Sequence, residues 1–357
     1  MKAGILRMFF LLGKLVFVWI FLITSNGCMS NYSLRNSNTK YSSDQFGVLT
    51  FLPWNDDWNK FMYPKDKAIK AMDLIKESEV KWVRLDFSRT KIQPDSEHKY
   101  EFEQFDWLVE ELRKRDLLIL GVLGYSPPWA AEDGKWNSPP KDIQKFGQYV
   151  SETVGRYKGK VDYWEIWNEP NDVDYWPPIV PWSVYADLLK ESYQAAKSAN
   201  SQCVVLHGGL AGARIQRLKE LYELGMKDYF DVVNIHLIDD NPASKNYTED
   251  VMKAISEARS VMGQFGDADK EMWWTEVGSS SMWNTRGDFS EERQAKILKE
   301  VLPAMLNSGQ VKRVFWAFFQ DTKKFFNLKG IDYYGLIRSN FSKKPSYRVL
   351  KELIRQD

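Results

Sequence analysis

The sequence predicts a single (β/α)₈ barrel, also called a TIM barrel, over residues 45–357. Three observations lead to this fold class. Eight short apolar runs follow residue 45. Segments with the 3.6-residue period of amphipathic helices lie between these runs, which indicates repeated βαβ units. The length also fits, because a barrel of this kind takes about 250 residues and tolerates longer loops.

The predicted strands are mostly continuous apolar runs rather than strict alternations of apolar and polar residues. This pattern is typical of parallel strands that are covered on both faces. The predicted strands are residues 46–52, 81–87, 117–123, 163–167, 203–207, 232–237, 272–275 and 313–318.

The predicted helices carry their apolar residues on one face. An open, doubly wound sheet is the alternative, but it would normally place a Gly-rich phosphate loop after the first strand. Residues 52–57 read Leu-Pro-Trp-Asn-Asp-Asp and contain no glycine. We find no internal repeat and no second domain boundary. The predicted helices are residues 67–78, 102–115, 143–157, 182–199, 215–224, 251–265, 291–306 and 345–354.

Residues 1–27 have the pattern of a secretory signal peptide. Lys2, Arg7 and Lys14 precede an apolar run at residues 15–23, and a charged segment followed by a short apolar segment is typical of such signals. The run is shorter than the roughly 20 residues that span a bilayer. An uncleaved N-terminal anchor is the alternative, and the charge of Lys14 counts against it.

Gly27-Cys28 directly follows this segment and resembles the end of a bacterial lipobox, in which the cysteine is lipidated. Ser25 departs from the usual leucine, and cleavage without a lipid is the alternative. Residues 28–44 are rich in Ser, Asn, Lys and Tyr, which predicts a flexible tether. Cys203, the other cysteine, lies in an apolar run, and we expect an inert buried thiol there.

The charge of the chain is nearly balanced, with 49 Lys and Arg against 48 Asp and Glu. A nucleic-acid partner would favour a basic face, so this balance argues against one. The three histidines have no paired spacing, and no cysteine cluster is present, so we predict no metal and no cofactor. The lack of a Gly-x-Ser-x-Gly motif disfavours a serine hydrolase.

Two carboxylates stand where predicted strands stop. Glu169 follows the fourth strand and Glu276 ends the seventh, and the carboxyl ends of barrel strands carry the catalytic groups of TIM barrels. A pair of facing carboxylates suits the cleavage of glycosidic bonds, provided that their pKa values are pushed apart. Burial beside Trp167 would raise one pKa, and Arg84 would keep the other carboxylate ionised. Glu165 is a rival that sits deeper in the strand, where we favour a structural role.

Trp167-Asn168-Glu169-Pro170-Asn171 resembles the Asn-Glu-Pro signature of clan A glycoside hydrolases, and Thr275-Glu276-Val277-Gly278 resembles their second signature. The resemblance covers about residues 45–350. It implies a retaining enzyme with Glu169 as acid/base and Glu276 as nucleophile. Similarity to family 39 members rests on residues 83–87, 124–129, Asn171 with Trp176, and residues 344–347.

The resemblance also implies substrate contacts. Asn168 would hold the 2-hydroxyl of the sugar, with a strand-end cap as the alternative. Trp316 would form the floor under the reacting sugar, with barrel packing as the alternative. His236 would take part in the site or be a satisfied core histidine. Many clan members place a tyrosine just after this histidine, and here Leu237 and Ile238 follow instead.

Several tryptophans lie in predicted loops after strands. Indole rings cover the apolar faces of sugars at a low entropic cost. We therefore expect Trp54, Trp129 and Trp176 to contact the substrate.

The sequence thus predicts an exported, lipid-anchored or secreted retaining glycoside hydrolase that cleaves O-glycosidic bonds in an oligo- or polysaccharide by double displacement. The partners expected are a carbohydrate and, through Cys28, a membrane. A carbohydrate-binding lipoprotein with an inactive barrel is one alternative. A transglycosylase that uses the same residues is the other. The sugar, the linkage, endo or exo cleavage and the oligomeric state stay open.

Overall fold

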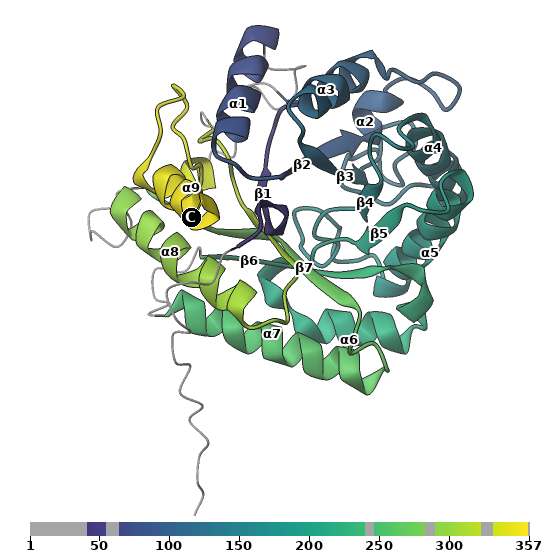
Figure 1. Ribbon diagram of the computed structural model, residues 1–357. Helices are drawn as coiled ribbons and strands as arrows, with labels where there is room; N and C mark the ends of the chain where they lie inside the picture. Colours follow the sequence, from purple (N-terminus) through teal and green to yellow (C-terminus); the bar gives the residue numbers. More distant parts are fainter. Residues whose placement is uncertain (1–40, 55–63, 240–245, 283–289, 323–330, 356–357) are drawn as a thin grey trace, which may run out of the picture. The chain divides into compact units, whose positions relative to one another are not determined.

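The computed structural model describes residues 41–54, 64–239, 246–282, 290–322 and 331–355. Within these residues, eight parallel strands pair in sequence order, and β8 returns to β1 to close a barrel. Helices surround the barrel (Figure 1). The predicted (β/α)₈ fold is confirmed. The predicted signal peptide, Cys28 and the tether up to residue 40 lie outside the described residues.

Every predicted strand is present, and each begins within one residue of its predicted start. β6 and β7 extend beyond their predicted ends, and β1 stops earlier. The strands are β1 (Phe46–Leu49), β2 (Trp82–Ser88), β3 (Leu118–Gly124), β4 (Tyr163–Ile166), β5 (Val204–His207), β6 (Val232–Asp239), β7 (Glu271–Ser279) and β8 (Arg313–Trp316).

The predicted helices are also present, and side chains cap several of them. Asp142 accepts a hydrogen bond from the Lys145 amide at the start of α4, and Ser290 does so from the Arg293 amide at α8. Such caps satisfy amides that have no partner within the helix. The short α2 was not predicted. The helices are α1 (Lys65–Glu77), α2 (Arg89–Ile92), α3 (Glu103–Lys114), α4 (Ile143–Arg156), α5 (Trp182–Ala199), α6 (Ile215–Glu223), α7 (Tyr247–Gln264), α8 (Glu291–Asn307) and α9 (Pro345–Arg355).

Large apolar side chains fill the amino-terminal half of the barrel interior. Trp82 of β2 lies against Trp273 of β7, with 5.3 Å between ring centroids. These strands are not neighbours in the barrel, so the contact crosses its interior. Side chains two residues apart on a strand share a face. Arg84 therefore points into the same interior, one layer nearer the carboxyl ends of the strands.

Two further expectations concern the thiol and the membrane. Cys203 is buried, and burial raises the pKa of its thiol to about 11. Thiolate chemistry is suppressed at such a pKa, so the expected inert thiol agrees with the structure. Among the described residues, no helix combines the length and the apolar character that a membrane span requires.

Candidate active site

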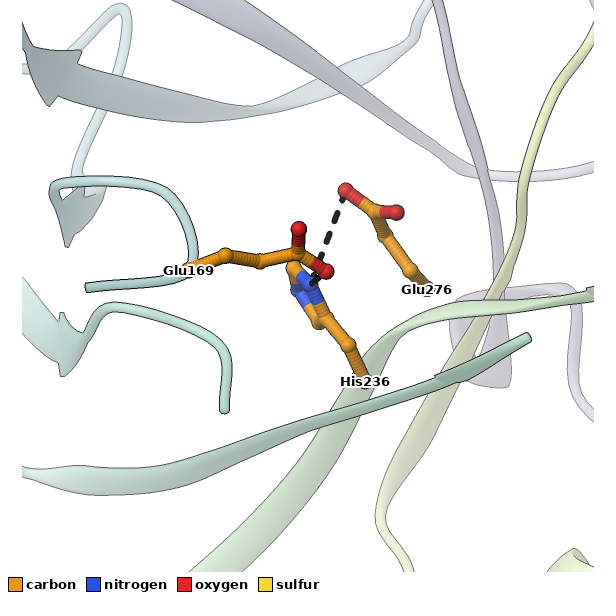
Figure 2. A group of neighbouring side chains, drawn as sticks. All are labelled: Glu169, His236 and Glu276. Carbon is orange, nitrogen blue, oxygen red and sulfur yellow. Dashed lines mark hydrogen bonds and ion pairs between the residues drawn. The ribbon is translucent and has the colours of Figure 1, made fainter. Parts of the chain in front are cut away.

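Polar side chains from four strands meet at the carboxyl end of the barrel. Arg84 comes from β2, Glu165 from β4, His236 from β6 and Glu276 from β7, while Glu169 follows the end of β4. Figure 2 shows the polar ends of Glu169, His236 and Glu276 pointing toward one another. The side chains of Glu169 and Glu276 keep 15% and 9% of their surface exposed. A small ligand can therefore reach both carboxylates.

Glu276 lies inside β7 rather than at its end, which corrects the predicted boundary. Ile235 of β6 faces Trp274, but the next residue, His236, faces Glu276, so β7 contains one extra residue. Such a bulge breaks the alternation of side chains. As a result Thr275 and Glu276, although adjacent, both contact His236.

Arg84 holds the two carboxylates of β4 and β7 together. Its Nε and Nη2 atoms donate to Glu165 at 2.7 and 2.9 Å, and Nη1 donates to Glu276 at 2.8 Å. Nη2 also donates to Asn168 Oδ1 at 2.8 Å. Burial alone would lower the pKa of Arg84, but the charges of Glu165 and Glu276 raise it above its ordinary value. The guanidinium thus stays charged beside Glu276.

Glu165, the alternative to Glu169 as a catalytic carboxylate, is part of this network. It is fully buried, and in addition to the hydrogen bonds from Arg84 it accepts one from the Gly209 amide at 3.0 Å. Burial tends to raise the pKa of Glu165, but Arg84 more than offsets this and lowers it. An ionised, fully hydrogen-bonded carboxylate with no exposed surface suits a structural anchor. A side chain at Gly209 would overlap the His236 ring, so this close approach requires glycine.

Glu169 has no cation as a direct partner among the described residues. Burial raises the pKa of Glu169 to about 8, and the negative charge of Asp172 adds to the shift. Burial also raises the pKa of Glu276, but His236 and Arg84 oppose that shift. Glu169 and Trp167 both have positive φ angles, 45° and 68°. Non-glycine residues in this region carry backbone strain, which concentrates at functional sites.

A chain of hydrogen bonds fixes the proton on His236. Asn234 Nδ2 donates to the His207 carbonyl at 3.3 Å, so Asn234 Oδ1 is left to accept the Thr275 hydroxyl at 2.7 Å. That hydroxyl has a single proton and therefore accepts from His236 Nε2, 2.8 Å away. Burial lowers the pKa of His236 to about 4, so the ring is neutral.

The neutral ring has its proton on Nε2, so Nδ1 can only accept a hydrogen bond. Glu169 Oε1 lies 3.0 Å from this Nδ1. Glu169 must therefore be protonated to make the bond, in agreement with its raised pKa. The sequence left two roles open for His236, a part in the site or a satisfied core histidine. Its side chain is 1% exposed and contacts both carboxylates.

One oxygen of each carboxylate and one His236 nitrogen lie within 4.8 Å of one another, a grouping that could hold a metal ion. The sequence spacing did not predict it, because the three residues are far apart in the chain. Arg84 lies 2.8 Å from Glu276 and Glu169 bonds to His236, so both groups already have partners. A fixed cation beside Glu276 also repels a second one. The donor set fits a hydrogen-bonded carboxylate pair better than a metal centre.

The predicted tryptophan contacts differ in exposure. Trp176 is 4% exposed and packs edge-on against Trp167 and Tyr185, so the ring belongs to the core and offers no open face to a sugar. Trp316 is 1% exposed and donates to the Tyr334 carbonyl at 3.0 Å, which favours barrel packing.

The other two tryptophans lie beside β2 and β3. Trp54 is 6% exposed and donates to Asp86 at 3.2 Å. Trp129 is half-buried and donates to the Gln93 carbonyl at 2.9 Å. Trp129 is therefore the most accessible of the four predicted tryptophan contacts.

Two residues at the site escaped the sequence prediction. Asp86 stands two positions after Arg84 on β2, so the strand period could have found it. Burial raises the pKa of Asp86 to about 6. Burial raises the pKa of Tyr175 well above its usual value, and the charges of Glu169 and Glu276 raise it further. Tyr175 thus brings a tyrosine near both carboxylates, although it comes from the segment after β4 rather than from β6.

Sequence comparisons identify glycosidases. Residues 187–330 match the family model of the glycosyl hydrolase catalytic core, a stretch that includes His236 and Glu276. A chloroplastic beta-glucosidase-like protein of Oryza sativa is 27% identical over 121 residues, which is 33% of this chain and 18% of that protein. Endo-1,4-beta-xylanase 2 of Claviceps purpurea is 32% identical over 102 residues, or 28% of this chain and 30% of the xylanase. The matched segment is thus less than a third of either relative.

Structure comparison supports the same fold over a longer part of the chain. A family 39 glycoside hydrolase from Bacteroides cellulosilyticus superposes with a TM-score of 0.70 at 22% identity. The match covers 87% of this chain and 63% of that enzyme. Residues 187–330 thus match the glycosyl hydrolase catalytic core in sequence, and the chain has a (β/α)₈ fold similar to that of the Bacteroides enzyme.

Proposed function

We propose that this protein is a retaining glycoside hydrolase that cleaves O-glycosidic bonds in an oligo- or polysaccharide by double displacement. The observation that carries the proposal is the short separation of two carboxyl groups, only one of which is ion-paired to Arg84 among the described residues. An oxygen of Glu169 and one of Glu276 lie within 4.8 Å. Retaining enzymes separate the two carboxyl groups by about 5–5.5 Å, and inverting enzymes by about 6.5–9.5 Å to admit a water.

The surroundings assign one role to each carboxylate. Glu169 carries a proton that it can give to the leaving oxygen, because its pKa is raised to about 8. Glu276 is ion-paired to Arg84 at 2.8 Å and can attack the anomeric carbon as a carboxylate. Glu169 then takes a proton from the water that hydrolyses the glycosyl-enzyme.

Arg84 and His236 support these roles without leaving their partners. Arg84 stabilises the ionised Glu276 before attack and after its release. The neutral His236 accepts from the protonated Glu169 and so orients its carboxyl group. Asn168 accepts a hydrogen bond from Arg84 at 2.8 Å and directly precedes Glu169, which supports it as a candidate contact for a sugar hydroxyl.

The test is a screen of defined oligosaccharides and aryl glycosides, with the anomer of the product read by NMR. β-Linked glucosides and xylosides come first, because the relatives are named as a beta-glucosidase-like protein and a beta-1,4-xylanase. We expect retained configuration. Inverted product would contradict the mechanism. Binding without turnover would favour a carbohydrate-binding protein, and transfer to a sugar acceptor would favour a transglycosylase.

Variants of the two carboxylates separate their roles. Glu276→Gln should abolish turnover on every glycoside. Glu169→Gln should spare the first step on activated aryl glycosides and show a burst, because deglycosylation is then slow. Azide should rescue Glu169→Ala with retained configuration. The control is Glu300→Gln, an exposed residue of α8 that should leave the rates unchanged. Azide rescue of a Glu276→Ala variant with retained product would reverse the two roles, because azide that replaces a missing nucleophile acts in a single displacement and gives inverted product.

We also propose that the enzyme is exported and anchored through a lipid on Cys28. The support is the charged and apolar pattern of residues 1–27, directly followed by Cys28. In a bacterial host, Cys28→Ser should move the protein from the membrane fraction to the soluble exported fraction. Equal membrane retention of both forms would contradict a lipid anchor.

A further inference from the structure

A second buried arginine directly follows β2, the strand that carries Arg84, and has no carboxylate partner in the described part of the chain. Arg89, the first residue of α2, is 1% exposed. Its Nε atom donates to Gln93 Oε1 at 2.7 Å. Neither of its terminal nitrogens, Nη1 and Nη2, has a hydrogen-bond partner among the residues that the structure describes. A buried guanidinium with unsatisfied donors is costly, so its retention calls for a ligand or another compensation.

Aromatic rings compensate part of this cost. The Cζ atom of Arg89 lies 5.1 Å from the Trp129 ring centroid and 5.8 Å from those of Phe146 and Tyr149. Each such contact is worth about 0.5–2 kcal/mol. Ring faces attract the positive charge, but they supply no lone pair for the N–H groups at the end of the guanidinium. That end matches a two-oxygen acceptor, which arginine binds bidentately.

Arg89 also lines an open pocket of about 350 Å³ between the segments that follow β2 and β3. These segments leave the carboxyl ends of their strands, the end of the barrel that carries Glu169 and Glu276. Figure 1 shows α2 beside α4, and α4 supplies Phe146 and Tyr149. The half-buried indole of Trp129 lines the pocket as well. The pocket therefore combines a guanidinium with an aromatic ring that can lie against a sugar.

The acidic residues of the pocket already have hydrogen-bond or ion-pair partners. Glu97 pairs with Lys145, Asp95 pairs with Lys99, and Asp142 caps α4. Within the described segments, Arg89 is thus a buried cation without a carboxylate in hydrogen-bond contact.

Two lysines line the pocket beside Arg89, and of these Lys145 is paired with Glu97, which leaves Lys141. It lies at the exposed edge of the pocket and has no ion pair in the described part of the chain. Arg89 and Lys141 face one remaining negative charge, that of Asp142, so the charge that no ion pair balances among the described residues is positive by one, which suits an anionic ligand.

We propose that this pocket binds an oxyanion group carried by a sugar, with Arg89 as the bidentate donor and Trp129 beside the ring. A uronic acid carboxylate and a sulfate ester share this chemistry. The link to catalysis rests on the proposed glycosidase function and would make the substrate an acidic glycan. The binding itself does not depend on that function.

The test is a calorimetric titration of the full chain with glucuronate, glucose and inorganic sulfate. We expect glucuronate to bind and glucose not to bind at the same concentrations. Arg89→Gln should weaken glucuronate binding at least about tenfold, because hydrogen bonds to a charged group are lost. Arg89→Lys should also weaken it, since a lysine cannot donate bidentately. Binding is read without turnover, so a failure of the hydrolysis screen leaves this result intact.

Two further variants keep the test valid if Arg89 substitutions unfold the chain. Lys141→Gln lies at the exposed edge and should weaken glucuronate binding about two- to fivefold. Lys296→Gln, an exposed residue of α8, is the matched control and should leave it unchanged. The proposal is overturned if glucose binds as well as glucuronate, or if a folded Arg89→Gln protein keeps full affinity. Sulfate that binds more tightly than glucuronate would overturn the sugar part.

Discussion

The two ends of the candidate site surround chemically identical carboxyl groups with different partners. Glu276 lies within β7, where Arg84 donates to it at 2.8 Å. Glu169 lies after β4 and bonds to the Nδ1 atom of the neutral His236 at 3.0 Å. Burial raises the pKa of both groups, but only Glu276 has a guanidinium in contact among the described residues.

The difference shows that the roles come from the partners rather than from the depth of burial. A cation in contact keeps one carboxylate ionised. A hydrogen-bond acceptor in contact keeps the other protonated. Each partner is fixed in turn by its own neighbours, Arg84 by Glu165 and His236 by Thr275. Substitutions of these partners and their neighbours therefore test the difference between the two carboxyl groups.

Removal of Arg84 has the largest expected effect. Arg84→Met leaves Glu165 and Glu276 without their cation in the barrel interior. We expect a loss of about 3–5 kcal/mol in the free energy of unfolding, as for other broken buried ion pairs. Activity should also disappear, because Glu276 would take up a proton. Denaturant unfolding and initial rates measure the two effects.

Arg89→Met is the matched control on the same chain segment. It removes a buried guanidinium whose terminal nitrogens have no hydrogen-bond partner within the described ranges, so stability should be unchanged or increased in the absence of a ligand. Equal destabilisation by the two substitutions would show that the ion pairs of Arg84 do not stabilise the fold more than the side chain of Arg89 does.

Thr275→Val tests the hydrogen-bond chain on the Glu169 side. It removes the acceptor of His236 Nε2 and the donor to Asn234 Oδ1. We expect a loss of about 1–3 kcal/mol in stability, the usual cost of unsatisfied buried groups. The ring can then carry its proton on Nδ1 and donate to an ionised Glu169. The pKa of Glu169 should fall, and the alkaline limb of kcat/KM should move to lower pH.

Thr153→Val provides the control for this prediction. Thr153 is buried in α4, and its hydroxyl donates to the Tyr149 carbonyl at 2.8 Å. Its loss should leave the pH profile unchanged. An unchanged profile for Thr275→Val as well would contradict the assignment of the His236 proton.

The smallest expected effect is electrostatic and concerns Asp172. Glu169 acts as an acid only while protonated, so activity should fall as pH rises through about 8. The negative charge of Asp172 contributes to this pKa, so Asp172→Asn should shift the limb to lower pH by about a few tenths of a unit. Asp174→Asn should shift it less, since the charge of Asp174 contributes less. Added salt should reduce the difference, and a shift to higher pH would contradict the sign.

The barrel was predictable because its strands are apolar runs and its helices are amphipathic, both of which are local properties. The four-residue α2 is too short for a helical period and was missed. The bulge in β7 was also missed, because the register depends on β6 and β8 rather than on the strand itself. The predicted end of β7 was therefore too early.

Part of the site was predictable from residues that lie on the barrel strands or directly after them. Arg84, Asn168, Glu169 and Glu276 meet as the fold class requires. Burial was not predictable from position: Trp176 follows a strand, yet packs into the core. The contact of His236 with Glu169 joins residues 67 positions apart, and a single sequence carries no signal for it.

Covalent trapping tests the central claim most directly. An activated 2-deoxy-2-fluoro aryl glycoside of the sugar chosen by the screen should form a stable glycosyl-enzyme, because the fluorine slows its hydrolysis. Peptide mass mapping of the labelled full-length protein should place one sugar on Glu276. Glu276→Gln should stay unlabelled, while the Glu300→Gln control is labelled normally. A label on Glu169, or turnover with inverted product and no label, would contradict the assignment of the two carboxylates.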